Sequence, residues 1–228
     1  MTGITTIEYE SIILSVKVSL TAIASSLPFG ILISWVLSKC RLPGKIWFET
    51  FINIPLVLPP IVTGYFLLIL FGQNGFIGQF LYKWFGFSVA FTWKGAAVAS
   101  AVVSFPLMVQ TMKVAMEGVD DGLERTAQLL RASPLRVFFT VTLPLSYRGI
   151  ITGSVLAFAR AFGEFGATIM LAGNIPGKTQ TMPLDIFSFS NQIDGEAPAL
   201  RLVIISIIIC YFSLISAYWF TRPWKAKR

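Results

Sequence analysis

The chain has 228 residues, of which 55% are hydrophobic and 13% are charged, and its formal net charge is +7. A soluble domain carries about 25% charged residues, so this composition, with a mean hydropathy of +0.73, is that of a membrane protein. The sequence contains no histidine, which excludes imidazole bases, Ser-His triads, HExxH metal sites and histidine-ligated haem.

Five apolar stretches approach or exceed the roughly 20 residues that a helix needs to cross the hydrocarbon core of a bilayer. They cover residues 11–38, 51–71, 91–112, 150–171 and 201–220. No internal repeat or low-complexity linker separates them, and the acidic Glu8 and Glu10 are not typical of a cleavable signal peptide. We therefore expect an all-α polytopic membrane protein with about five transmembrane helices, forming a single membrane domain over residues 1–228.

Most of the basic residues gather after the first span, between the third and fourth spans, and at the C-terminus. These groups are Lys39, Arg41 and Lys45; Lys113, Arg125, Arg131, Arg136 and Arg148; and Arg222, Lys225, Lys227 and Arg228. The intervening loops 72–90 and 172–200 hold only Lys83 and Lys178. Cytoplasmic loops collect Lys and Arg, so we expect the N-terminus outside and the C-terminus in the cytoplasm, and we assign the positive charge to membrane topology, not to nucleic-acid binding.

The second span contains NIPLVLPPIVTGY (residues 53–65), in which Pro55, Pro59 and Pro60 each remove a backbone donor. This span is therefore expected to be broken or bent. A bilayer tolerates such a break where neighbouring groups or a water-filled cavity satisfy the freed backbone. Pro59 and Pro60 thus mark either a packing kink or a translocation path. In the third span, SFPLM (104–108) holds a further proline, and Ser104 is a candidate pathway residue.

The fourth span carries a stripe of small residues at every fourth position, which is typical of close helix packing. The stripe consists of Gly149, Gly153, Ala157 and Ala161.

Arg160 and Glu164 lie on either side of Ala161, four residues apart, and are expected to pair on one face of the same helix. Ionisable residues inside a membrane are costly and point to function. The alternative is a mutually neutralising pair that orients the helix around GEFGAT (163–168), and the sequence leaves both open. Gly163 permits close backbone approach or local unwinding. We include Gly163 and Thr168 among the candidate pathway or gate residues.

The charged stretch between the third and fourth spans has Leu123, Ala127 and Leu130 on one helical face. Ser133 and Pro134 then provide a helix N-cap and a first-turn proline. We expect a short amphipathic helix, a break and a second helix before Pro144. The first helix can lie on a lipid surface or dock in a groove on a partner protein, and the physical pattern does not choose between them.

This stretch resembles the signature of the integral-membrane subunits of binding-protein-dependent ABC importers. That signature is Glu-Ala-Ala, three residues, Gly, nine residues, Ile, one residue and Leu-Pro. The matching positions are Thr126-Ala127, Arg131 in place of glycine, Val141 and Leu143-Pro144, with the acidic residue displaced by one to Glu124. The resemblance implies a coupling helix that docks in a cleft of an ATPase subunit through Leu123, Glu124, Ala127, Leu130, Arg131, Leu143 and Pro144.

Other segments resemble the molybdate permeases of this family: PLVLPPIVTGY (55–65), FARAFGEFGAT (158–168) and NIPGKTQTMPLDIF (174–187). The sulfate/thiosulfate permeases share the Gly-Glu-Phe-Gly-Ala element and are the nearest alternative. The resemblance implies a permease domain over the whole chain that imports molybdate, and also tungstate, across a bacterial inner membrane. It also implies a homodimer, two cytoplasmic ATPase subunits that bind ATP and Mg, and a periplasmic molybdate-binding protein.

Two further features bear on chemistry. AGNIPGKT (172–179) resembles a phosphate-binding loop, but it follows a membrane span and begins with alanine, so no nucleotide site is expected. Cys40 and Cys210 lie near opposite ends of different spans, so no disulfide is expected. We expect no catalytic residue, metal site or cofactor in this chain. A secondary transporter would need an intramembrane ion site or inverted repeats, and apart from Arg160 and Glu164 the sequence offers neither.

Overall fold

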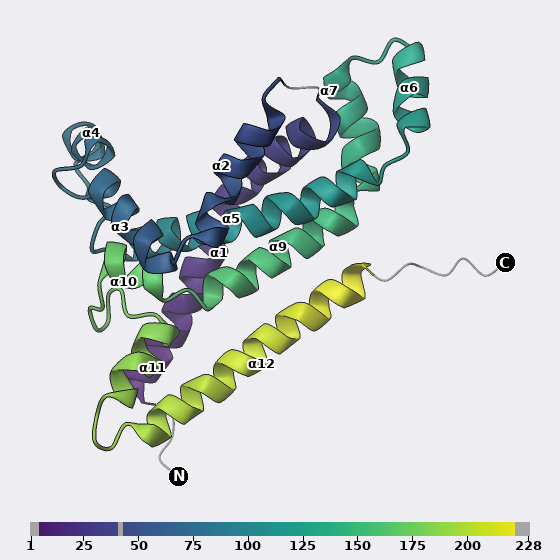
Figure 1. The fold of residues 1–228 in the computed structure, drawn as a ribbon. Coiled ribbons are helices and arrows are strands. Elements are labelled where there is room, and N and C mark those ends of the chain that lie inside the picture. The colour runs from purple at the N-terminus through teal and green to yellow at the C-terminus, as the bar shows by residue number, and fades with distance from the viewer. Residues whose placement is uncertain (1–4, 41–42, 222–228) are drawn as a thin grey trace.

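The structure is a computed structural model that describes residues 5–40 and 43–221. The regular structure of these residues is helical throughout. Four long helices lie along one another, α1 (Thr6–Lys39), α5 (Trp93–Glu117), α9 (Tyr147–Phe162) and α12 (Glu196–Thr221), with shorter helices at both ends of the bundle (Figure 1). Of the basic residues used to predict topology, Arg41, Arg222, Lys225, Lys227 and Arg228 lie outside the described residues.

Helix α1 contains the whole predicted first span and begins with a capping box. The backbone N–H of Thr5 donates to Glu8 Oε2 at 2.6 Å, and the N–H of Glu8 donates to Thr5 Oγ1 at 3.3 Å. These contacts satisfy two of the donors that a helix start leaves unpaired.

The second span is broken at its prolines, as the sequence predicts. Helix α2 (Lys45–Val57) meets α3 (Pro60–Phe71) at an angle of 110°. Pro60 stands at the start of α3, where its missing N–H has no helical partner to lose. Helix α4 (Phe76–Phe85) follows, before α5 forms the third span and keeps Pro106 inside it.

The predicted fourth span, residues 150–171, is not one continuous helix. Helix α9 ends at Gly163 and a separate helix, α10 (Gly166–Ala172), follows. The segment before α9 is itself helical, with α7 (Pro134–Val137), a π turn η1 (Phe138–Thr142) and α8 (Leu143–Leu145), and it bends by 70° into α9. Helix α11 (Met182–Ser190) then leads to α12.

Among the described residues, three helices are long and apolar enough to cross a membrane, and up to five spans result if each bent pair counts as one. The all-α polytopic class is therefore confirmed, and the upper number equals the predicted one. The fourth of these spans is Pro134–Leu145 with α9, so it begins earlier than the predicted residue 150.

The predicted small-residue stripe packs α9 against α5 within this chain. A Cβ atom at Gly149 would overlap the side chain of Ala115, and one at Gly153 would lie 3.1 Å from the carbonyl oxygen of Met108. Ala157 and Ala161 lie in the same buried cluster as Met108. The central helix α5 is thus fixed closely between α1 and α9.

Candidate functional site

Helix α6 (Asp121–Leu129) projects at one end of the bundle, far from α10 and α11 (Figure 1). Its predicted apolar face is uncovered, since Leu123 is 50% exposed and Leu130 is 80% exposed. Ala127 lies half-buried on the same face. The structure therefore brings these three residues together on a surface that this chain does not cover, and whether an ATPase contacts them stays a prediction.

Arg131 keeps the left-handed geometry that the family signature gives to glycine. Its φ is 65°. The N–H of Arg131 donates to Gln128 O at 2.9 Å, and the N–H of Ala132 donates to Ala127 O at 3.1 Å. These two bonds form a Schellman motif, so α6 ends here despite a conformation that costs a non-glycine residue about 1 kcal/mol.

Glu124 does not lie on the exposed face of α6. It is only 9% exposed, and its Oε1 accepts a hydrogen bond from Thr142 Oγ1 at 2.6 Å. Its Oε2 lies 3.1 Å from Lys39 Nζ at the end of α1. The signature gave no reason to single out Lys39 or Thr142, because both contacts join segments far apart in sequence.

Asp121 belongs to the same cluster. Its carboxylate accepts a hydrogen bond from Lys39 Nζ at 3.0 Å. This bond, together with the positive charge of the ammonium, holds the pKa of Asp121 below its usual value. The ion pair is therefore charged at neutral pH.

Leu143 and Pro144 lie in α8, at the bend into α9, and not on α6. The preceding π turn closes with the N–H of Leu143, which donates to Phe138 O, and Ser146 Oγ donates to Thr142 O at 2.7 Å. A proline lacks the N–H that would continue a regular helix, which is consistent with an irregular turn at this point. The end of the signature therefore marks a change of helix direction.

At the other end of the bundle, α3 lies beside α10 (Figure 1). A Cβ atom at Gly64 would lie 2.7 Å from Ala167 Cα, and one at Gly166 would lie 3.0 Å from Pro60 Cβ. Only glycine permits helices to approach so closely. Pro59, which caps α3, thus belongs to the same region as the break at Gly163. We call this contact between α3 and α10 the outer contact, after the side on which the predicted topology places it.

Arg160 and Glu164 form the predicted pair, with Arg160 donating to Glu164 Oε2 at 2.7 Å. They do not share one helix, however, because Glu164 follows the end of α9 at Gly163. Glu164 Oε1 accepts the N–H of Ala167 at 2.8 Å and the residue is 2% exposed. The pair therefore ties the end of α9 to the start of α10, which favours the orienting role.

The two candidate hydroxyls differ in their bonding. Ser104 donates to Ser100 O at 2.7 Å within its own helix. Thr168 in α10 is fully buried and, among the described residues, its Oγ1 has no hydrogen-bond partner. The same holds for Thr63 Oγ1 in α3, which sequence reasoning did not single out. Buried hydroxyls without partners are uncommon. Within the described residues, the outer contact therefore contains two hydroxyl groups, those of Thr63 and Thr168, that are free to form a hydrogen bond with another group.

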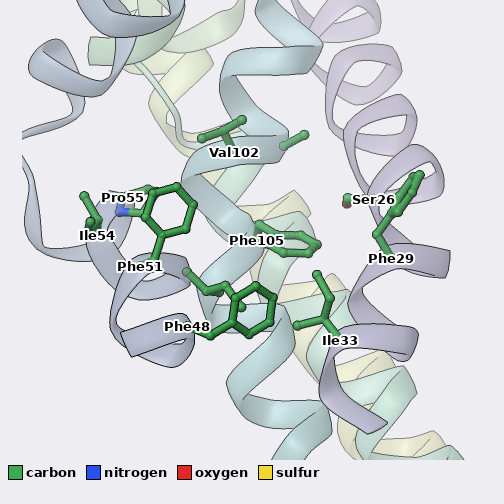
Figure 2. Close-up of a pocket in the computed structure, with 11 residues that line it drawn as sticks. Ser26, Phe29, Ile33, Phe48, Phe51, Ile54, Pro55, Val102 and Phe105 are labelled. Atoms are coloured by element: carbon green, nitrogen blue, oxygen red, sulfur yellow. The ribbon is translucent and has the colours of Figure 1, made fainter. Parts of the chain in front are cut away.

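A cavity of about 520 Å³ lies between α1, α2 and α5. Figure 2 shows Phe48, Phe51 and Phe105 gathered around it. Its lining contains no charged residue, and its hydroxyl, that of Ser26, donates to Ala22 O at 2.7 Å. This cavity is therefore unsuited to an anion.

The sequence also predicts no nucleotide site, no disulfide and no metal site in this chain. Residues 172–179 begin at the last residue of helix α10 and follow no strand, and Thr179 Oγ1 accepts the N–H of Ile175 at 3.0 Å within the loop. Cys40 and Cys210 are free thiols. In the described part of the chain, no three His, Cys, Asp or Glu side chains gather as a metal site would need.

The helical bundle, its two bent helix pairs and the projecting α6 define a polytopic membrane protein. A family model for the binding-protein-dependent transport system inner membrane component matches residues 26–225. The chain belongs to this family, and the predicted class is confirmed. Its fold is similar to that of a chain from a bacterial ABC transporter involved in the import of the acidic polysaccharide alginate, with a TM-score of 0.70 at 13% identity, covering 96% of this chain and 81% of that one.

Two curated relatives narrow the comparison. The molybdenum transport system permease protein ModB of Escherichia coli (strain K12) is 51% identical over 215 residues, covering 94% of both chains. The sulfate transport system permease protein CysT of Salmonella typhimurium is 41% identical over 169 residues, covering 74% of this chain and 61% of the relative.

Proposed function

We propose that this chain is the permease subunit of an ATP-driven importer that moves molybdate, and also tungstate, across the inner membrane. The observation that carries this proposal is the 51% identity to a molybdenum permease over 94% of both chains. A sulfate/thiosulfate permease is the second candidate, and the shorter match over 74% of this chain supports it less.

The assembly that we propose is a homodimer with two cytoplasmic ATPase subunits and one periplasmic molybdate-binding protein. The ATPase subunits bind ATP and Mg, and this chain binds neither. The exposed face of α6, with Leu123 and Leu130, is the docking surface for the ATPase. The N-terminus lies outside and the C-terminus in the cytoplasm, with the bilayer around the bundle.

Transport proceeds by alternating access. Binding of ATP closes the two ATPase subunits and brings the two α6 helices together, which biases the membrane bundle toward an outward-facing state. The oxyanion then enters from the binding protein. Hydrolysis of ATP returns the bundle to the inward-facing state.

The outer contact between α3 and α10 acts as the gate in this scheme. Pro59 and Pro60 on one side and Gly163 on the other allow the short helices to move against the long ones. The unpartnered hydroxyl of Thr168 can donate a hydrogen bond to an oxyanion, whereas that of Ser104 is already used. Because a carboxylate opposes an anion, the pair of Arg160 and Glu164 anchors the gate and is not itself the anion site.

The substrate is tested by co-expressing the chain with its ATPase and placing the complex in liposomes. ATP hydrolysis is then measured after adding binding protein loaded with molybdate or with sulfate. Stimulation by the molybdate-loaded form alone is expected. Stimulation only by the sulfate-loaded form would mean that the chain belongs to an ATP-driven importer of sulfate and not of molybdate. Uptake without any associated ATPase would contradict the proposal as a whole.

A further inference from the structure

Lys39 ends helix α1 and its ammonium group is surrounded by acceptors from the loop before α6 and from α6 itself. Lys39 Nζ lies 3.1 Å from Val119 O, 3.0 Å from Asp121 Oδ1 and 3.1 Å from Glu124 Oε2. An ammonium has three donors, so each donor of Lys39 has an acceptor. The side chain is only 13% exposed, which reduces competition from water.

The contacts extend beyond this pair of helices, because Glu124 also accepts the Thr142 hydroxyl at 2.6 Å. One buried carboxylate therefore joins the end of α1 to the π turn that leads into α9. A contact between charged groups with fixed geometry resists sliding more than an apolar contact does, since it is directional.

The outer end of α1 is also held by polar contacts. Glu8 lies 3.0 Å from the guanidinium of Arg201 in α12. Ser15 Oγ accepts the N–H of Met182 in α11 at 2.7 Å. Helix α1 has 34 residues and extends over about 51 Å at 1.5 Å per residue. Helix α1 is thus tied to α6 at one end and to α11 and α12 at the other.

We propose that Lys39 is a positioning residue that transmits the movement of α6 to helix α1. This inference rests on the proposed function, in which an ATPase moves α6. Through Lys39, a shift of the docking helix displaces α1 as well as α9, so two long helices respond to the ATPase. Without Lys39, α6 moves while α1 stays behind.

The test measures molybdate uptake per ATP hydrolysed, with the complete complex in liposomes and molybdate-loaded binding protein. Lys39→Met is expected to lower this ratio about tenfold, within the range of coupling between two sites. Lys39→Arg, which keeps the charge and the donors, is expected to restore most of it. Lys45→Met is the matched control. Lys39 and Lys45 both line a polar cavity of about 830 Å³, but Lys45 forms no ion pair among the described residues.

A double variant separates transmission from simple damage. Lys39→Met combined with Glu124→Gln is expected to lower the ratio no further than either change alone, because both remove the same contact. Additive losses would contradict the inference. If Lys39→Met does not accumulate in the membrane, Glu124→Gln, which keeps the size of the side chain, is measured in its place against the same expected fall.

A parallel variant, Ala127→Trp, distinguishes this inference from the function on which it rests. If Ala127→Trp lowers uptake per ATP while Lys39→Met leaves it normal, only the role of Lys39 is overturned. If neither variant changes the ratio, the docking of α6 on an ATPase is wrong, and the inference fails with it.

Discussion

The two ends of the helical bundle are held together by different forces. At the end that the proposed topology places inside, here called the inner end, α6 is fixed by hydrogen-bonded charged groups, with Lys39 between Asp121 and Glu124. At the outer contact, α3 and α10 touch through backbone at Gly64 and Gly166. Among the described residues, no hydrogen bond or ion pair joins these two short helices.

This difference indicates different mechanical roles. Directional contacts at the inner end make α6 move together with its neighbours, whereas a glycine contact without polar bonds can separate and form again at low cost. Packed interfaces of this kind favour two discrete arrangements. The inner end therefore suits transmission of movement, and the outer contact suits opening and closing.

Reversing the charge of Glu124, which contacts both Lys39 and Thr142, gives the largest expected effect. Glu124→Lys places a second ammonium beside Lys39 in a site that is only 9% exposed. Breaking a buried ion pair costs about 3–5 kcal/mol. We expect α6 to detach from α1 and become sensitive to limited proteolysis, while membrane insertion is retained. Unchanged protection of α6 would show that the ion pair does not fix this helix.

The outer contact is tested by adding one methyl group. Gly64→Ala would place a Cβ atom 2.7 Å from Ala167 Cα. Such overpacking costs about 1–3 kcal/mol, so α3 and α10 are expected to separate and uptake to fall. Gly118→Ala is the control, since Gly118 lies outside the gate and the nearest atom to its Cβ would be Ala115 O at 3.5 Å, an ordinary contact. Equal uptake by both variants would show that the close approach of α3 and α10 is not needed for the gate.

The helix end at Arg131 gives a smaller, opposite effect. Arg131→Gly removes a side chain from a residue with φ of 65°, and we expect about 1 kcal/mol of added stability at the end of α6. Thermal unfolding of the purified protein measures this change. A loss of stability would mean that the arginine side chain contributes more at this position than its backbone strain costs.

The smallest expected effect is a change in the pH dependence of stability, and it comes from Asp185 in α11, which lies near Glu8 in α1. Burial, with the neighbouring Glu8 carboxylate, raises the pKa of Asp185, although a hydrogen bond from Ser11 opposes this. The folded state thus holds the proton above the usual pKa, so stability falls as pH rises from that usual value through the raised one. Asp185→Asn is expected to flatten this decline in a series of unfolding measurements. An unchanged slope would exclude Asp185 as its cause.

The sequence predicted what depends on local pattern. It located five apolar stretches, the break at Pro59 and Pro60, the N-cap at Ser133 and the uncovered face of α6. It placed Arg160 and Glu164 in one helix, although it noted that Gly163 permits unwinding. In the structure α9 ends before Gly163, and Glu164 Oε1 accepts the N–H of Ala167 at the start of α10. The sequence could not show that Glu124 contacts Lys39 and Thr142, since these contacts join distant segments.

The most direct test of the link between α6 and the ATPase is uptake per ATP hydrolysed in the complete complex. Ala127→Trp is compared with Arg125→Trp. Residue 125 lies about 200° around α6 from residue 127, so its tryptophan points away from the docking face. We predict that Ala127→Trp abolishes the coupling of hydrolysis to uptake, while Arg125→Trp keeps most of it. Normal coupling in Ala127→Trp would contradict the claim that α6 links an ATPase to the gate.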